Sequence, residues 1–157
     1  MCLTCGIAAG KIVPVGGIIY KDDYVVLHHC IDVNIAGYLI ISPVRHVEEY
    51  SGLNVTEIIQ IGTVMKAAAA ILSEMDGIEK IYLANFGEET AHFHMHIFPR
   101  YKWMLNCSAE DIHTDNKIDG AKLLSIYRKR FKVERDAMDN DYIINVVEGI
   151  RNRLVVT

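Results

Sequence analysis

The segment at residues 92–100 reads HFHMHIFPR, so three histidines alternate with apolar residues. Strict alternation predicts a β-strand, because successive side chains of a strand point to opposite faces. The apolar residues would then enter a core, while His92, His94 and His96 share the other face. Neighbours on one face of a strand lie about 7 Å apart. We therefore expect a row of imidazoles on one rigid element.

This row of imidazoles predicts a functional site. Three imidazoles that are buried together without a function would leave polar nitrogens to satisfy and charges to repel. Imidazoles titrate near neutral pH, so they can act in metal, acid–base or nucleophilic chemistry. One metal ion bound by all three is disfavoured. The outer two residues would lie roughly 13 Å apart, whereas metal–nitrogen bonds are about 2 Å long.

The length and charge of the chain limit its class. A chain of 157 residues that is 51% hydrophobic and 23% charged fits one globular domain. A net charge of −4 argues against a nucleic-acid partner, and we interpret the basic run at 128–130 as a solvated face. Since no run approaches 18 apolar residues, we expect no membrane contact. The first residues lack a basic stretch followed by an apolar block, so we expect a cytoplasmic protein.

Local patterns predict an α+β fold. We expect five strands, at residues 17–20, 24–29, 38–41 and 78–85 and in the histidine segment. A capping box at Asn54 and Glu57 should begin a long helix that ends near residue 75. We expect residues 102–118 to be irregular and residues 121–131 and 141–154 to form helices. Short turns and one long helical insertion favour antiparallel strands over βαβ repeats.

At His92–Phe98 the chain resembles the histidine triad (HIT) family of nucleotide hydrolases and transferases. The family signature is His-φ-His-φ-His-φ-φ, with φ apolar, and the chain matches every position. The segment at residues 37–46, GYLIISPVRH, resembles the glycine, apolar strand, proline, basic residue and histidine that precede the signature in the family. The resemblance covers about residues 2–101. Residues 102–157 would then be a helical extension of a single domain that spans residues 1–157.

The resemblance implies a fold and an activity. The fold would be an antiparallel β-sheet meander with a long helix after the third strand and C-terminal helices, in a homodimer whose two sheets join. The activity would be hydrolysis of a nucleotide phosphoanhydride or phosphoramidate, in a dinucleoside polyphosphate or related nucleotide. His94 would be the nucleophile, and His96 would stabilise the phosphoryl oxygens. The alternative is a nucleotide-binding regulatory module with weak or no turnover.

Two residues before the triad are candidate substrate contacts. Asn85 matches in type a ligand-contacting asparagine of the family, and Thr90 is the nearest hydroxyl donor. Either residue could instead make hydrogen bonds within a turn. The loop between them is short, and Glu88 and Glu89 replace neutral phosphate donors of the family. Carboxylates repel phosphate unless they are protonated, turned away or bridged by a cation.

The second predicted strand also departs from the family. Cys30 stands where the family has an Asp or Asn that holds the ribose, with Asp32 close by. This departure, like the acidic loop, favours the regulatory alternative. His28 and His29 adjoin Cys30, and neighbouring side chains on a strand face opposite ways. At most one of these histidines could therefore line a pocket, and we interpret both as surface residues at a strand end.

The N-terminal Cys2-x-x-Cys5 has the spacing of half a zinc site. The resemblance supplies the other half, because family members that carry this pair complete it with two histidines. These would be His46 and His92, which gives a structural Cys₂His₂ zinc site with no open position. The other possibility is a pair of free thiols near a frayed terminus.

Overall fold

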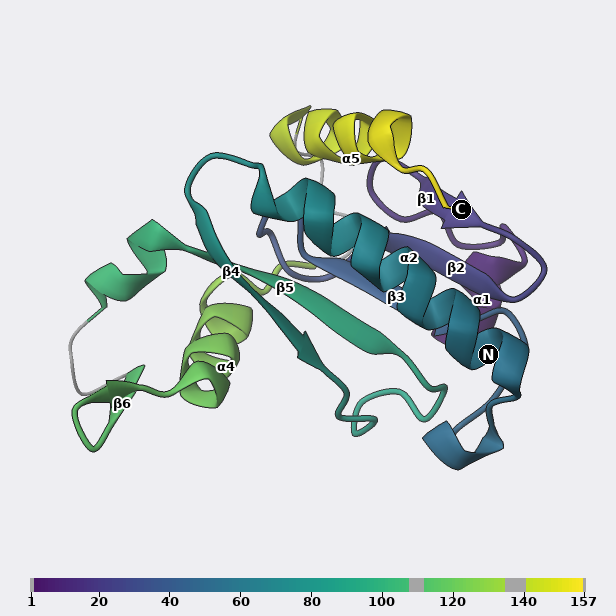
Figure 1. The fold of residues 1–157 in the computed structure, drawn as a ribbon, viewed down its shortest axis with the longest axis horizontal. Coiled ribbons are helices and arrows are strands. Elements are labelled where there is room, and N and C mark those ends of the chain that lie inside the picture. The colour runs from purple at the N-terminus through teal and green to yellow at the C-terminus, as the bar shows by residue number, and fades with distance from the viewer. Residues whose placement is uncertain (1, 108–111, 135–140, 157) are drawn as a thin grey trace.

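The computed structural model describes residues 2–107, 112–134 and 141–156 (Figure 1). Within these residues, five antiparallel strands form the central sheet in the order β1-β2-β3-β5-β4. The strands are β1 (Ile18–Lys21), β2 (Val25–His29), β3 (Leu39–Pro43), β4 (Ile78–Ala84) and β5 (Met95–Tyr101). The first three form a meander. The chain then crosses to the far edge, so β5 lies between β3 and β4. The predicted α+β fold is confirmed.

Helices follow the order expected from the sequence. The long helix α2 (Val55–Ser73) follows β3, and α4 (Gly120–Arg130) and α5 (Asp141–Arg153) follow the sheet. A short N-terminal helix, α1 (Leu3–Ala8), was not predicted. The stretch expected to be irregular contains two short elements, the 3₁₀ helix η2 (Lys102–Asn106) and the hairpin β6 (His113–Thr114) with β7 (Lys117–Ile118). A further 3₁₀ turn, η1 (Tyr50–Gly52), precedes α2.

Helices pack on both faces of the sheet. On one face α2 and α5 cover Leu39, Ile41 and Ile97, and Figure 1 shows both helices on the same side of the sheet. On the other face α4 packs against Tyr38 and Phe98, and α1 packs against the neighbouring part of β2. Since α1 and α4 cover different parts of this second face, the sheet between them is available for a site.

The helix α2 begins at the predicted capping box. The Asn54 side chain accepts a hydrogen bond from the Glu57 N–H at 2.9 Å, and a Glu57 carboxylate oxygen accepts one from the Asn54 N–H at 2.8 Å. By length and composition alone, α2 could also span a membrane. However, Ile61, Val64 and Leu72 are buried against the sheet, so its apolar residues serve the core of this fold.

The histidine segment differs from the single strand that was predicted. β5 begins only at Met95, and His92 lies in a bend before it. The pairing of β5 with β3 ends at Met95, so residues before it do not join the β-ladder. The Phe93 N–H donates instead to the carbonyl of Val47, in the loop after β3, at 2.6 Å. The expected row of three imidazoles is therefore wrong at its first member. His94 and His96 remain neighbours, with ring centroids 4.8 Å apart.

Candidate active site and metal centre

A cavity of about 680 Å³ lies over the sheet face that α1 and α4 cover. The floor is formed by residues of β2 and the position after it, of β3 and of the histidine segment, namely His28, Cys30, Ile40, His94 and His96. One wall comes from α1, a second from α4 and the chain after it, and a third from the loop at residues 86–90. The cavity therefore joins the two predicted catalytic histidines to the C-terminal extension.

His94 has a defined hydrogen-bonding state in this cavity. Its Nδ1 lies 2.8 Å from the main-chain carbonyl of His92, and since a carbonyl can only accept, Nδ1 carries the hydrogen. The Nε2 of a neutral ring then holds the lone pair. The side chain is half-buried and lines the cavity. This arrangement suits a nucleophile.

His96 is held by the hydroxyl of Tyr38, which lies 2.8 Å from its Nδ1. Both side chains are buried. Burial, together with electrostatic repulsion from His94 and Arg128 against a protonated ring, lowers the pKa of His96 to about 3, so the ring is neutral at pH 7. Burial also raises the pKa of Tyr38, which keeps its proton. We assign Tyr38 as the donor to Nδ1, which places the hydrogen of His96 on Nε2, a donor suited to a phosphoryl oxygen.

The two predicted substrate residues are placed differently. Thr90 belongs to the described residues that line the cavity, whereas Asn85 does not. The Asn85 side-chain amide donates to the main-chain carbonyl of His94 at 2.7 Å. Asn85 thus holds the backbone of the predicted nucleophile, and Thr90 lies in the cavity wall.

The interpretation of His28 and His29 as surface residues is wrong, since both are buried. β2 is an inner strand with helices on both faces, so neither face meets solvent. His28 lines the cavity, and burial lowers its pKa to about 4. Its Nδ1–H donates to the His29 carbonyl at 2.7 Å, and its buried Nε2 has no hydrogen-bond partner among the described residues. Sequence reasoning missed this acceptor, although the alternation rule allowed one of the two histidines to face a pocket.

A buried thiol and a carboxylate, those of Cys30 and Asp32, follow His28 along the chain. Cys30 donates a hydrogen bond to Asp32 at 3.4 Å, and both residues line the cavity. Burial raises the pKa of the Cys30 thiol, with the Asp32 charge adding to the effect. Cys30 therefore stays protonated, and the Asp32 carboxylate is the charged acceptor in this part of the cavity.

Two residues of the basic run on α4, Lys129 and Arg130, are exposed as expected for a solvated face, but Arg128 is partly buried. Arg128 and Lys129 line the cavity, whereas Arg130 is exposed and its guanidinium lies 5.2 Å from the Tyr127 ring centroid. Arg128 forms an ion pair with Glu89 of the short loop, at 3.7 Å. Consecutive residues of a helix point in different directions around its axis. The run of three charges alone therefore did not reveal which residues line the cavity.

Beside the cavity, the four predicted metal ligands come together. Ligand atoms of Cys2, Cys5, His46 and His92 all lie within 4.8 Å of one another. The Nδ1 of His92 lies 3.5 Å from the Cys2 sulfur and 3.6 Å from the Cys5 sulfur, and the Nδ1 of His46 lies 3.4 Å from the Cys5 sulfur. Tetrahedral zinc, with bonds of about 2.3 Å to sulfur and about 2.0 Å to nitrogen, places such atoms about 3.5 Å apart. The donor set fits zinc.

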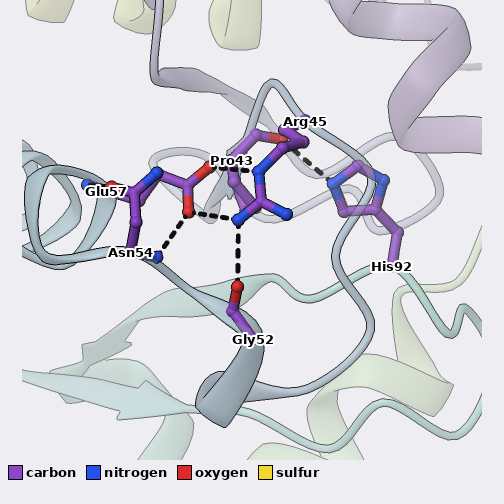
Figure 2. Close-up of polar contacts among 6 residues, drawn as sticks. All are labelled: Pro43, Arg45, Gly52, Asn54, Glu57 and His92. Atoms are coloured by element: carbon purple, nitrogen blue, oxygen red, sulfur yellow. Dashed lines mark hydrogen bonds and ion pairs between the residues drawn. The ribbon is translucent and has the colours of Figure 1, made fainter.

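The ring orientations also suit a metal. The Nε2–H of His92 donates to the Pro43 carbonyl at 3.0 Å (Figure 2). The Nδ1 lone pair is therefore left toward the two thiols. The Nε2 of His46 lies 3.4 Å from a carboxylate oxygen of Glu48. Burial would raise the pKa of the Cys2 thiol, but hydrogen bonds from Cys5 and His46 outweigh burial and lower it. A lowered thiol pKa favours the thiolate that binds metal, whereas burial and the hydrogen bond with Cys2 raise the pKa of the Cys5 thiol.

An ion pair fixes the loop that carries His46. Arg45 donates to both carboxylate oxygens of Glu57, at 3.0 and 2.8 Å, and to the Gly52 carbonyl at 2.9 Å (Figure 2). Burial would raise the pKa of Glu57, but the bonds from Arg45 and from the Asn54 backbone lower it. The loop after β3 is thereby tied to the first turn of α2, next to the metal ligands.

Comparisons with known proteins agree with this geometry. The HIT domain model matches residues 16–103. The "Protein hit" of Bacillus subtilis is 32% identical over 105 residues, which are 64% of this chain and 71% of that protein. A crystal structure of a hypothetical histidine triad nucleotide-binding protein from Sulfolobus tokodaii has a TM-score of 0.62 at 19% identity, over 98% of this chain and 91% of that one. A Zn-bound histidine triad family protein from Mycobacterium smegmatis has a TM-score of 0.57 at 18% identity, over 80% and 94% of the two chains.

Proposed function

Because this chain belongs to the HIT family, we propose that it is a hydrolase that cleaves a phosphoanhydride or phosphoramidate bond of a nucleotide. The nucleotide would occupy the cavity over β5, with its α-phosphate beside His94. The observation that carries the proposal is the state of His94, whose Nδ1–H is engaged by the His92 carbonyl while Nε2 keeps its lone pair. A neutral imidazole in this state is a good nucleophile near pH 7.

The first step is attack of the His94 Nε2 on the α-phosphorus. The N–P bond forms, the bond from phosphorus to the leaving atom breaks, and that atom takes the electron pair. His94 becomes a nucleotidyl-imidazolium whose Nδ1–H stays on the His92 carbonyl. The Nε2–H of His96 and the hydroxyl of Thr90 would donate to the phosphoryl oxygens, where negative charge develops. Asn85 acts by positioning the His94 backbone.

The second step is hydrolysis of the intermediate. Water attacks phosphorus, the N–P bond breaks, and its electron pair returns to the His94 Nε2. The water proton passes to solvent, so a nucleoside monophosphate leaves and His94 is again neutral. One difficult displacement is thereby divided into two easier ones.

We also propose that Cys2, Cys5, His46 and His92 bind a structural zinc ion. Four protein ligands leave no open position, so the ion would supply stability and no Lewis-acid chemistry. The relative from Mycobacterium smegmatis, which is Zn-bound, supports this assignment. We further propose a single domain and a homodimer, as the family resemblance implies.

The alternative is a nucleotide-binding regulatory module with weak or no turnover. Cys30 favours it, because a protonated thiol is a poor partner for ribose hydroxyls. Asp32 lines the cavity two residues later and can supply the missing acceptor. The hydrolase therefore stays the better supported function.

The test is the His94→Ala variant assayed with diadenosine tetraphosphate and adenosine 5′-phosphoramidate. Turnover should fall on the order of 10⁴-fold or more, while AMP binding by calorimetry changes only a few-fold. His113→Ala, which alters a histidine outside the cavity, is the control. Full turnover in His94→Ala would exclude the mechanism. Binding of AMP by the unaltered protein without turnover of either compound would favour the regulatory module.

A further inference from the structure

The C-terminal extension places three cations at the cavity. Arg128 and Lys129 come from α4, and Lys132 follows it, where the chain pairs with Val33 after β2. Arg128 is the most enclosed of them, with a side chain only 25% exposed. Among the described residues, its Nε is buried and has no hydrogen-bond partner. A buried guanidinium N–H without an acceptor is costly, so the atom is suited to a ligand that brings one.

The partner of Arg128 explains the acidic loop. Glu89 stands where a carboxylate would repel phosphate, and its ion pair with Arg128 bridges that charge. The pair is 3.7 Å long and the Glu89 side chain is 69% exposed, so the contact is weak. A phosphate, which can accept two hydrogen bonds from one guanidinium, would compete well for Arg128.

We propose that Arg128 determines substrate specificity by binding the phosphate of the leaving group, so that the site selects phosphoanhydrides over phosphoramidates. This inference rests on the proposed function, whose chemistry it narrows to one substrate class. The extension outside the family match at residues 16–103 would then supply the selecting group.

The layers of the fold place Arg128 on the leaving-group side. His94 and His96 belong to the cavity floor, whereas α4 covers the same face of the sheet from above. In phosphoryl transfer the attacking and leaving atoms lie roughly in line through phosphorus. A leaving group displaced by a floor nucleophile therefore departs away from the sheet, toward the covering elements that carry Arg128.

The charges that line the cavity nearly cancel, so a bound phosphate needs a specific donor. Three cations are accompanied by four carboxylates, those of Asp32, Glu88, Glu89 and Glu134. The described lining residues therefore carry no excess of positive charge. A phosphate would be held by individually placed donors. An amine leaving group would need a proton instead. Burial lowers the pKa of His28 to about 4 and that of His96 to about 3, so neither ring carries a spare proton at pH 7.

The experiment compares Arg128→Gln with Arg130→Gln. Both variants remove one positive charge from α4, but Arg130 is exposed and does not line the cavity. The readout is the ratio of kcat/KM for diadenosine tetraphosphate to kcat/KM for adenosine 5′-phosphoramidate. We expect the ratio to fall about 10- to 100-fold in Arg128→Gln and to stay within a factor of three in Arg130→Gln. An unchanged ratio in Arg128→Gln, or an equal fall in both variants, would overturn the inference.

A binding measurement separates this inference from the proposed function. In the His94→Ala background, ATP should bind at least tenfold more tightly than AMP, and Arg128→Gln should remove most of that preference. This result would support the role of Arg128 as a phosphate ligand even if the unaltered protein hydrolysed neither compound. Equal binding of ATP and AMP, or binding of neither, would overturn it.

Discussion

The hydroxyl of Tyr38 should control catalysis through the tautomer of His96. It lies 2.8 Å from Nδ1, and both side chains are buried. The Tyr38→Phe change removes this donor and leaves a buried acceptor. The hydrogen of His96 is then free to occupy Nδ1, and in that tautomer the ring presents no Nε2–H to the substrate.

The size of the effect follows from burial. A buried acceptor left without a partner costs about 1–3 kcal/mol. If the loss is realised in the transition state, where His96 donates to the phosphoryl oxygens, kcat should fall about 10- to 100-fold. KM should change less, because the base and ribose contacts are untouched.

The assay is kcat and KM for Tyr38→Phe, with the nitrogen chemical shifts of His96 as a direct report of the tautomer. Tyr101→Phe is the matched control. It loses an equally buried bond, from the Tyr101 hydroxyl to the Ala36 carbonyl at 2.9 Å, outside the cavity. Both variants should lose stability, but only Tyr38→Phe should lose kcat. If kcat is unchanged, or the Nε2–H tautomer persists, Tyr38 has a packing role alone.

Two further predictions concern the metal centre and the ion pair between Arg45 and Glu57. Cys5→Ser should remove stoichiometric zinc from protein purified without a nickel column and lower Tm by about 10 °C, whereas Cys107→Ser should keep both. A metal-free parent protein with unaltered Tm in Cys5→Ser would contradict the zinc assignment. For Glu57, the folded-state pKa lies below its ordinary value of 4.5, so its stabilisation is complete above that pH and lost as pH falls through the folded-state pKa. Urea unfolding should find Glu57→Gln less stable by about 1 kcal/mol at pH 7, because Arg45 is half-exposed, with the difference shrinking below pH 4.5. A difference that stayed constant down to pH 3 would show that the carboxylate charge is irrelevant.

The elements that the sequence predicted well depend on local rules. The Asn54 capping box and the long helix after it need only neighbouring residues, and both were found within two residues of the expected ends. The strands were located by alternation and turn residues, with ends displaced by up to three residues. The helix α1 has six residues and no capping side chain, so local propensity gave no signal.

The parts that the sequence did not predict depend on packing between distant segments. Burial of both His28 and His29 requires an inner strand with helices on each face, which no alternation within β2 reveals. Placement of Arg128 depends on how α4 crosses the sheet, so a run of three basic residues looked like an ordinary solvated surface. The pairing of Glu89 with Arg128 likewise joins segments about forty residues apart.

His92 connects the metal centre to the predicted nucleophile. Its side chain lies among Cys2, Cys5 and His46, and its Nε2–H is fixed on the Pro43 carbonyl. Its main-chain carbonyl meanwhile accepts the hydrogen bond that sets the tautomer of His94. A ligand set that immobilises the His92 ring therefore also holds the carbonyl that orients His94. His92 thus serves both the metal centre and the orientation of His94. Disruption of the metal centre should therefore reduce kcat as well as Tm, even though none of its ligands would touch the substrate.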